Sequence, residues 1–85
     1  MNQHTLEIET RPQPDALERI LRVTRHRGFR ITSMQMDEMD NCQNLRIQVT
    51  VCSERSIALL RNQLTKLIDV ARVSELGSSQ QQKWA

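Results

Sequence analysis

The feature that most constrains this chain is LERILRVTRHRGFRITSMQM, at residues 17–36, which reads as an amphipathic helix, a glycine and a strand. Side chains for one helical face recur at i, i+3, i+4 and i+7: Leu17, Ile20, Leu21 and Thr24. Gly28 follows a basic last turn, where a helix commonly ends in the left-handed conformation that suits glycine. Phe29 and Ile31 then begin a strand with a period of two. We expect every other segment to pack on this unit or to pair beside it.

The rest of the chain predicts an alternation of strands and helices. The predicted elements are, in order, a strand at residues 4–10, a helix from about residue 15 to 27, strands at 29–36 and 45–52, a helix at 53–67 and a strand at 68–76. Asp15 and Glu18 have the spacing of a capping box, which favours a helix start near Pro14 or Asp15. Ser53 is the expected N-cap of the second helix.

This βαββαβ order predicts an α+β, ferredoxin-like fold. Right-handed connections give one antiparallel four-stranded sheet with two helices on one face, and the other face stays open for solvent or a partner. Met34 and Met36 suit either a partner surface or sheet packing, and the sequence favours neither. We expect residues 77–85 to form a flexible polar tail, in which Trp84 is either covered by a partner or part of a disordered end.

Composition excludes several classes of function. The net charge of +2 is too close to neutral to indicate nucleic acid by itself, and the cations are mostly arginine, which suits protein interfaces. An RNA-recognition module needs aromatic side chains on its central strands, and the aromatic residues here are Phe29 and Trp84. The sequence shows no signal peptide and no apolar run of transmembrane length. We therefore expect a cytoplasmic protein in which Cys42 and Cys52 are reduced.

No catalytic or metal signature stands out. Nucleophilic catalysis needs Ser or Cys beside His, but His4 is near the terminus, His26 lies between two arginines and Cys52 closes a strand. Two cysteines without a CxxC spacing make a weak metal site. A small acidic group could hold a divalent cation, although a solvated loop is the stronger interpretation: Asp37, Glu38 and Asp40.

Two motifs carry a resemblance to a known family: RHRGFRITSM at residues 25–34 and QLTKLIDVARVSEL at 63–76. At this separation they resemble the ACT domain of acetolactate synthase (acetohydroxyacid synthase) small subunits. In that family a helix ends in an R-G-[FY]-x-I run and the domain closes with Q-L-x-K-L-[IV]-D-V-x-x-V. The resemblance covers residues 3–76 as a single ACT domain, without the second domain of longer small subunits, as in the isozyme II type.

The resemblance implies a non-catalytic regulatory subunit that activates a large catalytic subunit. The family's large subunit uses thiamine diphosphate, Mg²⁺ and usually FAD, so this chain is expected to hold no cofactor. The reaction condenses pyruvate with pyruvate or 2-oxobutanoate, in the synthesis of valine, leucine and isoleucine. The resemblance also implies an ACT–ACT homodimer within a hetero-oligomer, with no nucleic acid and no membrane as partner.

The chain departs from the family at the positions that bind valine between two ACT domains. The degenerate pocket positions are Pro12, Asp15, Ala16, Arg30 and Ile31. Pro12 and Arg30 replace two asparagines, and Asp15 replaces a glycine that lets the backbone approach the ligand carboxylate. Asp15 also places a negative charge beside that carboxylate. We therefore expect valine regulation to be weak or absent, and Arg30 could pair with Asp15 and fill the pocket.

Two other functions stay open at this stage. A free-standing ACT module could sense another small ligand or amino acid, which would require an open polar pocket at Asp15 and Arg30. A nucleic-acid-binding domain of the same fold is disfavoured by the missing aromatic residues. For an activator, the contact surface could be the open sheet face, a strand edge or the basic helix, and the sequence does not choose among them.

Overall fold

The computed structural model describes residues 2–39 and 43–80, which form six elements in the predicted order. These are β1 (Asn2–Thr10), α1 (Ala16–His26), β2 (Arg30–Glu38), β3 (Leu45–Ser53), α2 (Ile57–Thr65) and β4 (Val70–Gln80). The loop cysteine Cys42 and the tail residue Trp84 lie outside the described residues.

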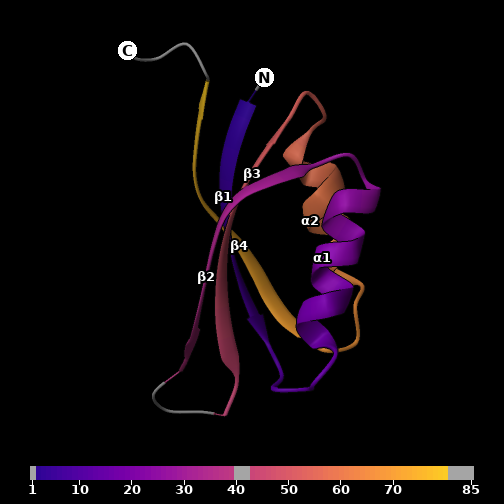
Figure 1. The fold of residues 1–85 in the computed structure, drawn as a ribbon, viewed down its shortest axis with the longest axis vertical. Helices are drawn as coiled ribbons and strands as arrows, with labels where there is room; N and C mark the ends of the chain where they lie inside the picture. Colours follow the sequence, from indigo (N-terminus) through magenta and orange to yellow (C-terminus); the bar gives the residue numbers. More distant parts are fainter. Residues whose placement is uncertain (1, 40–42, 81–85) are drawn as a thin grey trace.

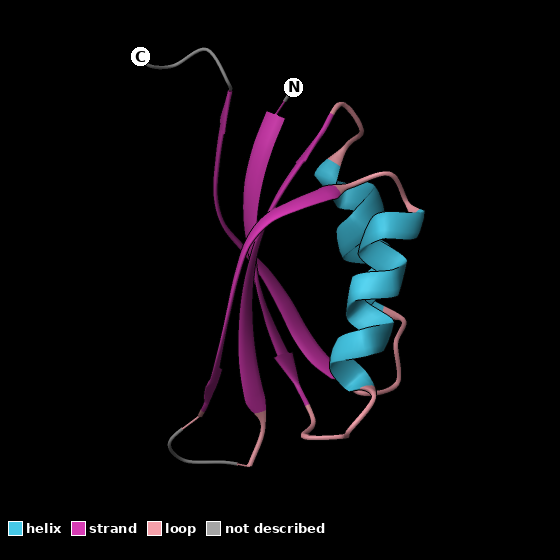
Figure 2. Ribbon diagram, viewed as in Figure 1, coloured by secondary structure: helices cyan, strands magenta, loops and turns pink. Residues whose placement is uncertain are grey.

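The strands form one antiparallel sheet in the order β2-β3-β1-β4, and both helices lie on the same face of it (Figures 1 and 2). The central strands pair in a register that places Leu6 opposite Val49 and Ile8 opposite Ile47. The predicted ferredoxin-like fold is therefore confirmed. β2 and β4 are the two edges of the sheet.

The core lies between the sheet and the helices. Alternate residues of β1 and β3 point towards it, as the period of two predicted, and Leu6 and Ile47 are fully buried. Ile20 of α1 and Leu60 and Leu64 of α2 close the core from the helical side. Phe29 is the one aromatic side chain among the described core residues and is 2% exposed, so this core is almost wholly aliphatic as expected.

The helix–glycine–strand unit has the predicted geometry. Gly28 has a φ of +88°, its amide donates to the Arg25 carbonyl at 3.1 Å, and the Phe29 amide donates to the Thr24 carbonyl at 3.1 Å. These two hydrogen bonds are those of a Schellman motif, with Arg27 as the C-cap. The reversal sends Phe29 directly into the core.

The predicted start of the first helix is confirmed, but its capping interaction and the predicted cap of the second helix are wrong. Asp15 stands at the N-cap of α1 but makes no capping hydrogen bond, and its carboxylate instead meets Arg19 at 2.7 Å. α2 begins later than expected, with Ser56 as its cap, and the Ser56 hydroxyl accepts from the Ala58 amide at 3.3 Å. The buried Ser53 hydroxyl has a different role, because it donates to the Gly28 carbonyl at 3.0 Å and so ties the end of β3 to the α1–β2 turn.

β4 differs from its predicted bounds at both ends. Residues 68–69 belong to the turn after α2, and the strand runs from Val70 to Gln80, past residue 76 where the sequence predicted its end. Its last residues pair with the start of β1, which begins at Asn2 rather than at His4. Residues 81–85 of the predicted tail lie outside the described part of the chain.

Candidate ligand site and interaction surfaces

The five predicted pocket positions fall into two groups at opposite ends of α1. Pro12 and Asp15 are exposed in the loop before the helix, and Ala16 is its buried first residue. Arg30 and Ile31 follow the helix, at the start of β2. A helix the length of α1 (11 residues) spans about 17 Å, so one chain does not bring the two groups together.

Strand register gives the same separation. Arg30 lies opposite Cys52, which lies opposite Gln3, whereas the loop that carries Asp15 leaves the sheet at the other end of β1, after Thr10. The expected pairing of Arg30 with Asp15 is therefore wrong within the chain. Arg30 is exposed, and Ile31 is half-buried against the core.

Asp15 belongs to an ion-pair network that the sequence did not reveal. Arg19 lies between two carboxylates, with Nη2 at 2.7 Å from Oδ2 of Asp15 and Nη1 hydrogen-bonded to Oδ2 of Asp69. The Asp69 carbonyl also accepts from the Arg11 amide and from the Thr10 hydroxyl, each at 2.9 Å. Asp69 therefore holds both the start of the 11–15 loop and the first turn of α1.

This network changes the chemistry of the loop. The Asp15 side chain is 53% exposed beside the Arg19 guanidinium, while the Asp69 side chain is 13% exposed and more strongly shielded from water. The loop position that the resemblance assigned to a ligand carboxylate therefore carries an aspartate that is already paired with Arg19. Sequence spacing could not indicate this, because Arg19 and Asp69 are 50 residues apart.

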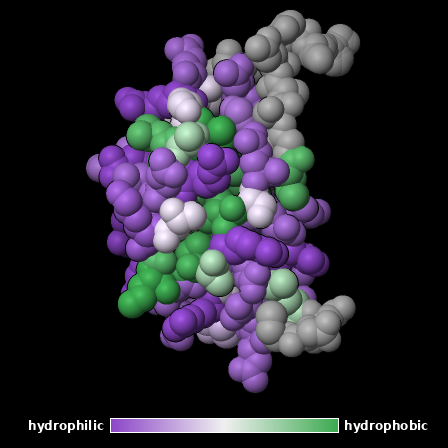
Figure 3. All heavy atoms as spheres, turned by 180° about the vertical axis from the view of Figure 1, so that it is seen from behind, coloured by the Kyte–Doolittle hydropathy of each residue, from purple (hydrophilic) through white to green (hydrophobic). Residues whose placement is uncertain are grey.

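The edge strand β2 leaves apolar surface uncovered. Met34 and Met36 lie opposite Val49 and Ile47 and so share the core-facing side of the sheet. They are nevertheless 40% and 48% exposed, because the helices do not reach this part of β2. Of the two alternatives that the sequence left open, the structure favours an exposed surface that a partner could contact over packing within the sheet. Seen from behind, the molecule shows further hydrophobic side chains in a broken band between polar ones (Figure 3).

The open sheet face is polar and pairs its own charges. Arg46 lies at 3.5 Å from both Glu7 and Asp37, and Arg72 lies at 3.8 Å from Glu9. A small cavity of about 70 Å³ lies among these side chains. Cross-strand pairs of this kind contribute little stability individually, but they leave the face with little unbalanced charge.

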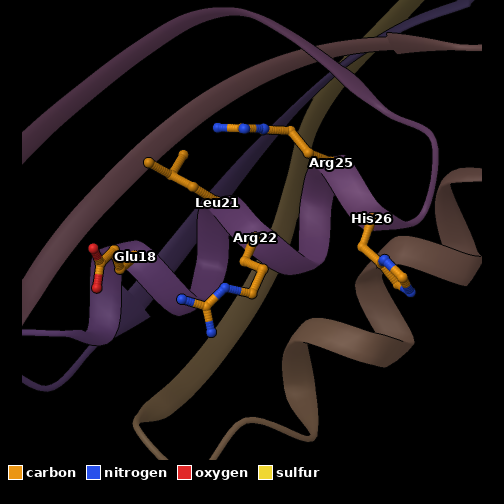
Figure 4. Close-up of a pocket in the computed structure, with 5 residues that line it drawn as sticks. All are labelled: Glu18, Leu21, Arg22, Arg25 and His26. Carbon is orange, nitrogen blue, oxygen red and sulfur yellow. The ribbon is translucent and has the colours of Figure 1, made fainter.

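The outer face of α1 forms a wider and more open hollow, of about 460 Å³, lined by Glu18, Leu21, Arg22, Arg25 and His26 (Figure 4). Arg22, Arg25 and His26 are exposed, and Leu21 is half-buried. We call this the α1 hollow. The sequence placed Leu21 on the core-facing side of the helix, whereas the structure leaves it half-buried in the lining of this hollow.

Catalytic and metal chemistry finds no support in the described residues. His4 is bound by Glu75, with Nδ1 and Oε2 2.8 Å apart, His26 is exposed on α1, and the free Cys52 is buried. Among residues 2–39 and 43–80, no three His, Cys, Asp or Glu side chains are arranged to hold a metal ion. No helix of that part of the chain has the length and apolar character needed to cross a membrane.

Comparison with known proteins gives consistent matches. The ACT domain family model matches residues 12–73. The acetolactate synthase isozyme 2 small subunit of Escherichia coli is 50% identical over 74 residues, which cover 87% of this chain and 85% of that protein. The isozyme 3 small subunit of Escherichia coli is 38% identical over 63 residues, covering 73% of this chain and 39% of that protein. The crystal structure of an acetolactate synthase small subunit from Thermotoga maritima superposes with a TM-score of 0.77 at 22% identity, covering 86% of this chain and 46% of that one.

Proposed function

The chain belongs to the ACT-domain family of acetolactate synthase small subunits, and on that premise we propose that it activates a large acetolactate synthase subunit without responding to valine. The observation that carries the proposal is the 50% identity to the isozyme 2 small subunit, which extends over 85% of that protein's length. The relative is a small subunit by name, so the role that follows is regulatory rather than catalytic.

The partner in this proposal is a large subunit that carries all of the catalytic machinery. Thiamine diphosphate, Mg²⁺ and FAD belong to that subunit, and the reaction serves the synthesis of valine, leucine and isoleucine. Both proteins act in the cytoplasm. A folded subunit can activate a partner simply by binding best to its active conformation, and this requires no chemistry in the small subunit.

Loss of valine regulation is supported by the loop before α1. Asp15 adds a carboxylate where the ligand's own carboxylate would approach, and Pro12 offers no backbone N–H there. Arg19 partly balances the charge of Asp15, but it also holds the side chain in place at 2.7 Å. A ligand would have to displace a formed ion pair before it reached the backbone.

Homodimerisation side by side through β2 completes the proposal. A two-fold axis beside β2 would bring the end of α1 in one chain towards its start in the other, and so would join Arg30 and Ile31 to Pro12, Asp15 and Ala16 across the interface. The free β2 edge and the exposed Met34 and Met36 support this arrangement. The degenerate pocket would then lie between two chains.

The test is the acetolactate-forming rate of the purified cognate large subunit, titrated with this chain, with and without millimolar valine. The expected result is a saturable rise that valine does not reverse. A rise that valine reverses would show that Asp15 and Arg30 leave the pocket functional. No rise would remove the activator assignment and favour an ACT module that senses another small ligand.

A further inference from the structure

The outer face of α1 carries positive charge that the described chain does not neutralise. Arg22 and Arg25 are exposed, and both line the α1 hollow. Within residues 2–39 and 43–80, the arginines in ion pairs lie elsewhere: Arg19, Arg46 and Arg72. Glu18 precedes Arg22 by one turn and also lines the hollow, yet no ion pair joins it to either arginine in that part of the chain.

Helix stability explains only part of this charge. Cations stabilise a helix in its last turn, where they face the negative end of the helix dipole, and Arg25 and His26 occupy that turn in α1. Arg22 lies one turn earlier, where the dipole effect has largely faded. Arg27 has a structural use, because its guanidinium donates to the Gln63 side chain at 3.0 Å and joins the two helices. Arg22 makes no comparable contact with the rest of residues 2–39 and 43–80.

The opposite face of the molecule shows the contrast. There Arg46 is paired with Glu7 and Asp37, and Arg72 with Glu9, so both of these arginines already face carboxylates. Charge steers an approaching partner only where it is unbalanced. The α1 face is therefore better suited than the sheet face to select a charged partner.

The side chains that line the hollow indicate which kind of partner could bind there. Figure 4 shows the Leu21 and Arg25 side chains directed to one side of α1, and Arg22 and His26 directed away from them. Leu21 offers apolar surface, and guanidinium groups lie on both sides of it. This surface fits an apolar side chain flanked by carboxylates. Nucleic acid is a less favoured occupant, because the Glu18 carboxylate in the hollow repels phosphate groups.

We propose that the α1 hollow docks an acidic surface segment of the large subunit, with an apolar side chain against Leu21 and carboxylates at Arg22 and Arg25. This inference rests on the proposed function and names the surface through which activation occurs. It selects the basic helix among the three surfaces that the sequence left open.

The experiment compares charge-neutralised variants in the complex with the large subunit. Arg22→Gln and Arg25→Gln are titrated into the cognate large subunit at low and moderate ionic strength, with acetolactate formation and sedimentation velocity as readouts. Arg72→Gln is the matched control, because it removes the same charge from an exposed arginine on the opposite face. Circular dichroism confirms that each variant is folded.

The half-saturating concentration is expected to rise about fivefold for each α1 variant, which corresponds to about 1 kcal/mol for a partly desolvated charge pair. It should stay unchanged for Arg72→Gln. Added salt should weaken the wild-type complex more than the complex of a variant that carries both Arg22→Gln and Arg25→Gln. The inference is overturned if the wild-type chain activates and the α1 variants bind the large subunit equally well. It is also overturned if the variants change only the self-association of the isolated chain in sedimentation velocity, or if their only effect is to abolish an RNA gel shift that the wild-type chain gives. If wild-type chain itself neither binds nor activates, the proposed function has failed, which is a separate outcome.

Discussion

Gly28→Ala isolates the backbone conformation on which the α1–β2 turn depends. Gly28 has a φ of +88°, which an L-residue adopts at a cost of about 1–2 kcal/mol. The turn cannot easily relax to a negative φ, because the Gly28 amide and carbonyl are both hydrogen-bonded, to the Arg25 carbonyl at 3.1 Å and the Ser53 hydroxyl at 3.0 Å. The local hydrogen bonds therefore hold the strained conformation in place.

Two further effects change the size of the loss. Alanine restricts the unfolded chain, which returns about 0.4–1 kcal/mol to the folded state. The added Cβ would lie 3.0 Å from Nε and 3.4 Å from Cδ of Arg55, but this side chain is exposed and flexible and can move away at small cost. The expected net destabilisation is about 1 kcal/mol, combined from the backbone strain and the entropy change.

The assay is urea unfolding followed by circular dichroism, at one protein concentration for all variants because self-association would raise apparent stability. A loss of this size lowers the midpoint by about 0.5–1 M urea with an unchanged slope, or lowers Tm by about 4–8 °C. Arg55→Ala and the double variant separate strain from contact. The reasoning is refuted if Gly28→Ala unfolds at the wild-type midpoint, or if its loss disappears once Arg55 is truncated.

Three further predictions concern the network, the core and the free edge. Asp69→Asn should lower the free energy of unfolding by about 0.5–1.5 kcal/mol, and Asp15→Asn by less than about 0.5 kcal/mol. The reason is that the Asp69 side chain is 13% exposed and the Asp15 side chain is 53% exposed. Equal losses of the two variants in urea unfolding would contradict this. Leu64→Ala should lower the free energy of unfolding by about 2–5 kcal/mol, because it leaves a cavity at a fully buried position. Leu59→Ala is the control: Leu59 is 38% exposed, and its truncation should lower the free energy of unfolding by less than about 1 kcal/mol. Met36→Lys should weaken self-association in sedimentation equilibrium. It should not lower the unfolding midpoint at a protein concentration where the chain is monomeric, since the side chain is 48% exposed; an unchanged mass distribution would argue against a dimer through β2.

The strands and the helix–glycine turn were predictable because their signals are local. Leu6, Ile8, Ile47 and Val49 alternate with polar residues, and alternation decides which face is buried whatever the rest of the chain does. Gly28 likewise marks a position where one residue type suits one backbone conformation. The fold class followed from the order of these elements, and the resemblance in residues 25–34 and 63–76 agreed with it.

The caps and the strand end were not predictable, because local signals compete there. Ser53 and Ser56 can each cap a helix by residue type, and only the burial of Ser53 against Gly28 leaves the capping role to Ser56. Likewise, Gly77 and the serines after it have little strand propensity, yet β1 supplies a strand edge with which their backbone pairs. In both cases a tertiary partner decided between local alternatives.

The candidate site shows the same limit with a functional consequence. The local sequence indicated that Asp15 is a capping residue, and the family resemblance assigned it to a ligand position. In the structure its carboxylate pairs with Arg19, which also hydrogen-bonds Asp69. The network stabilises the very loop that would otherwise have to stay adaptable to close on a ligand. An activating subunit needs this loop only as part of a stable fold that presents its surfaces to a partner. Under the proposed function the loop does not have to respond to a ligand, and the Asp15–Arg19–Asp69 network can hold it in one conformation.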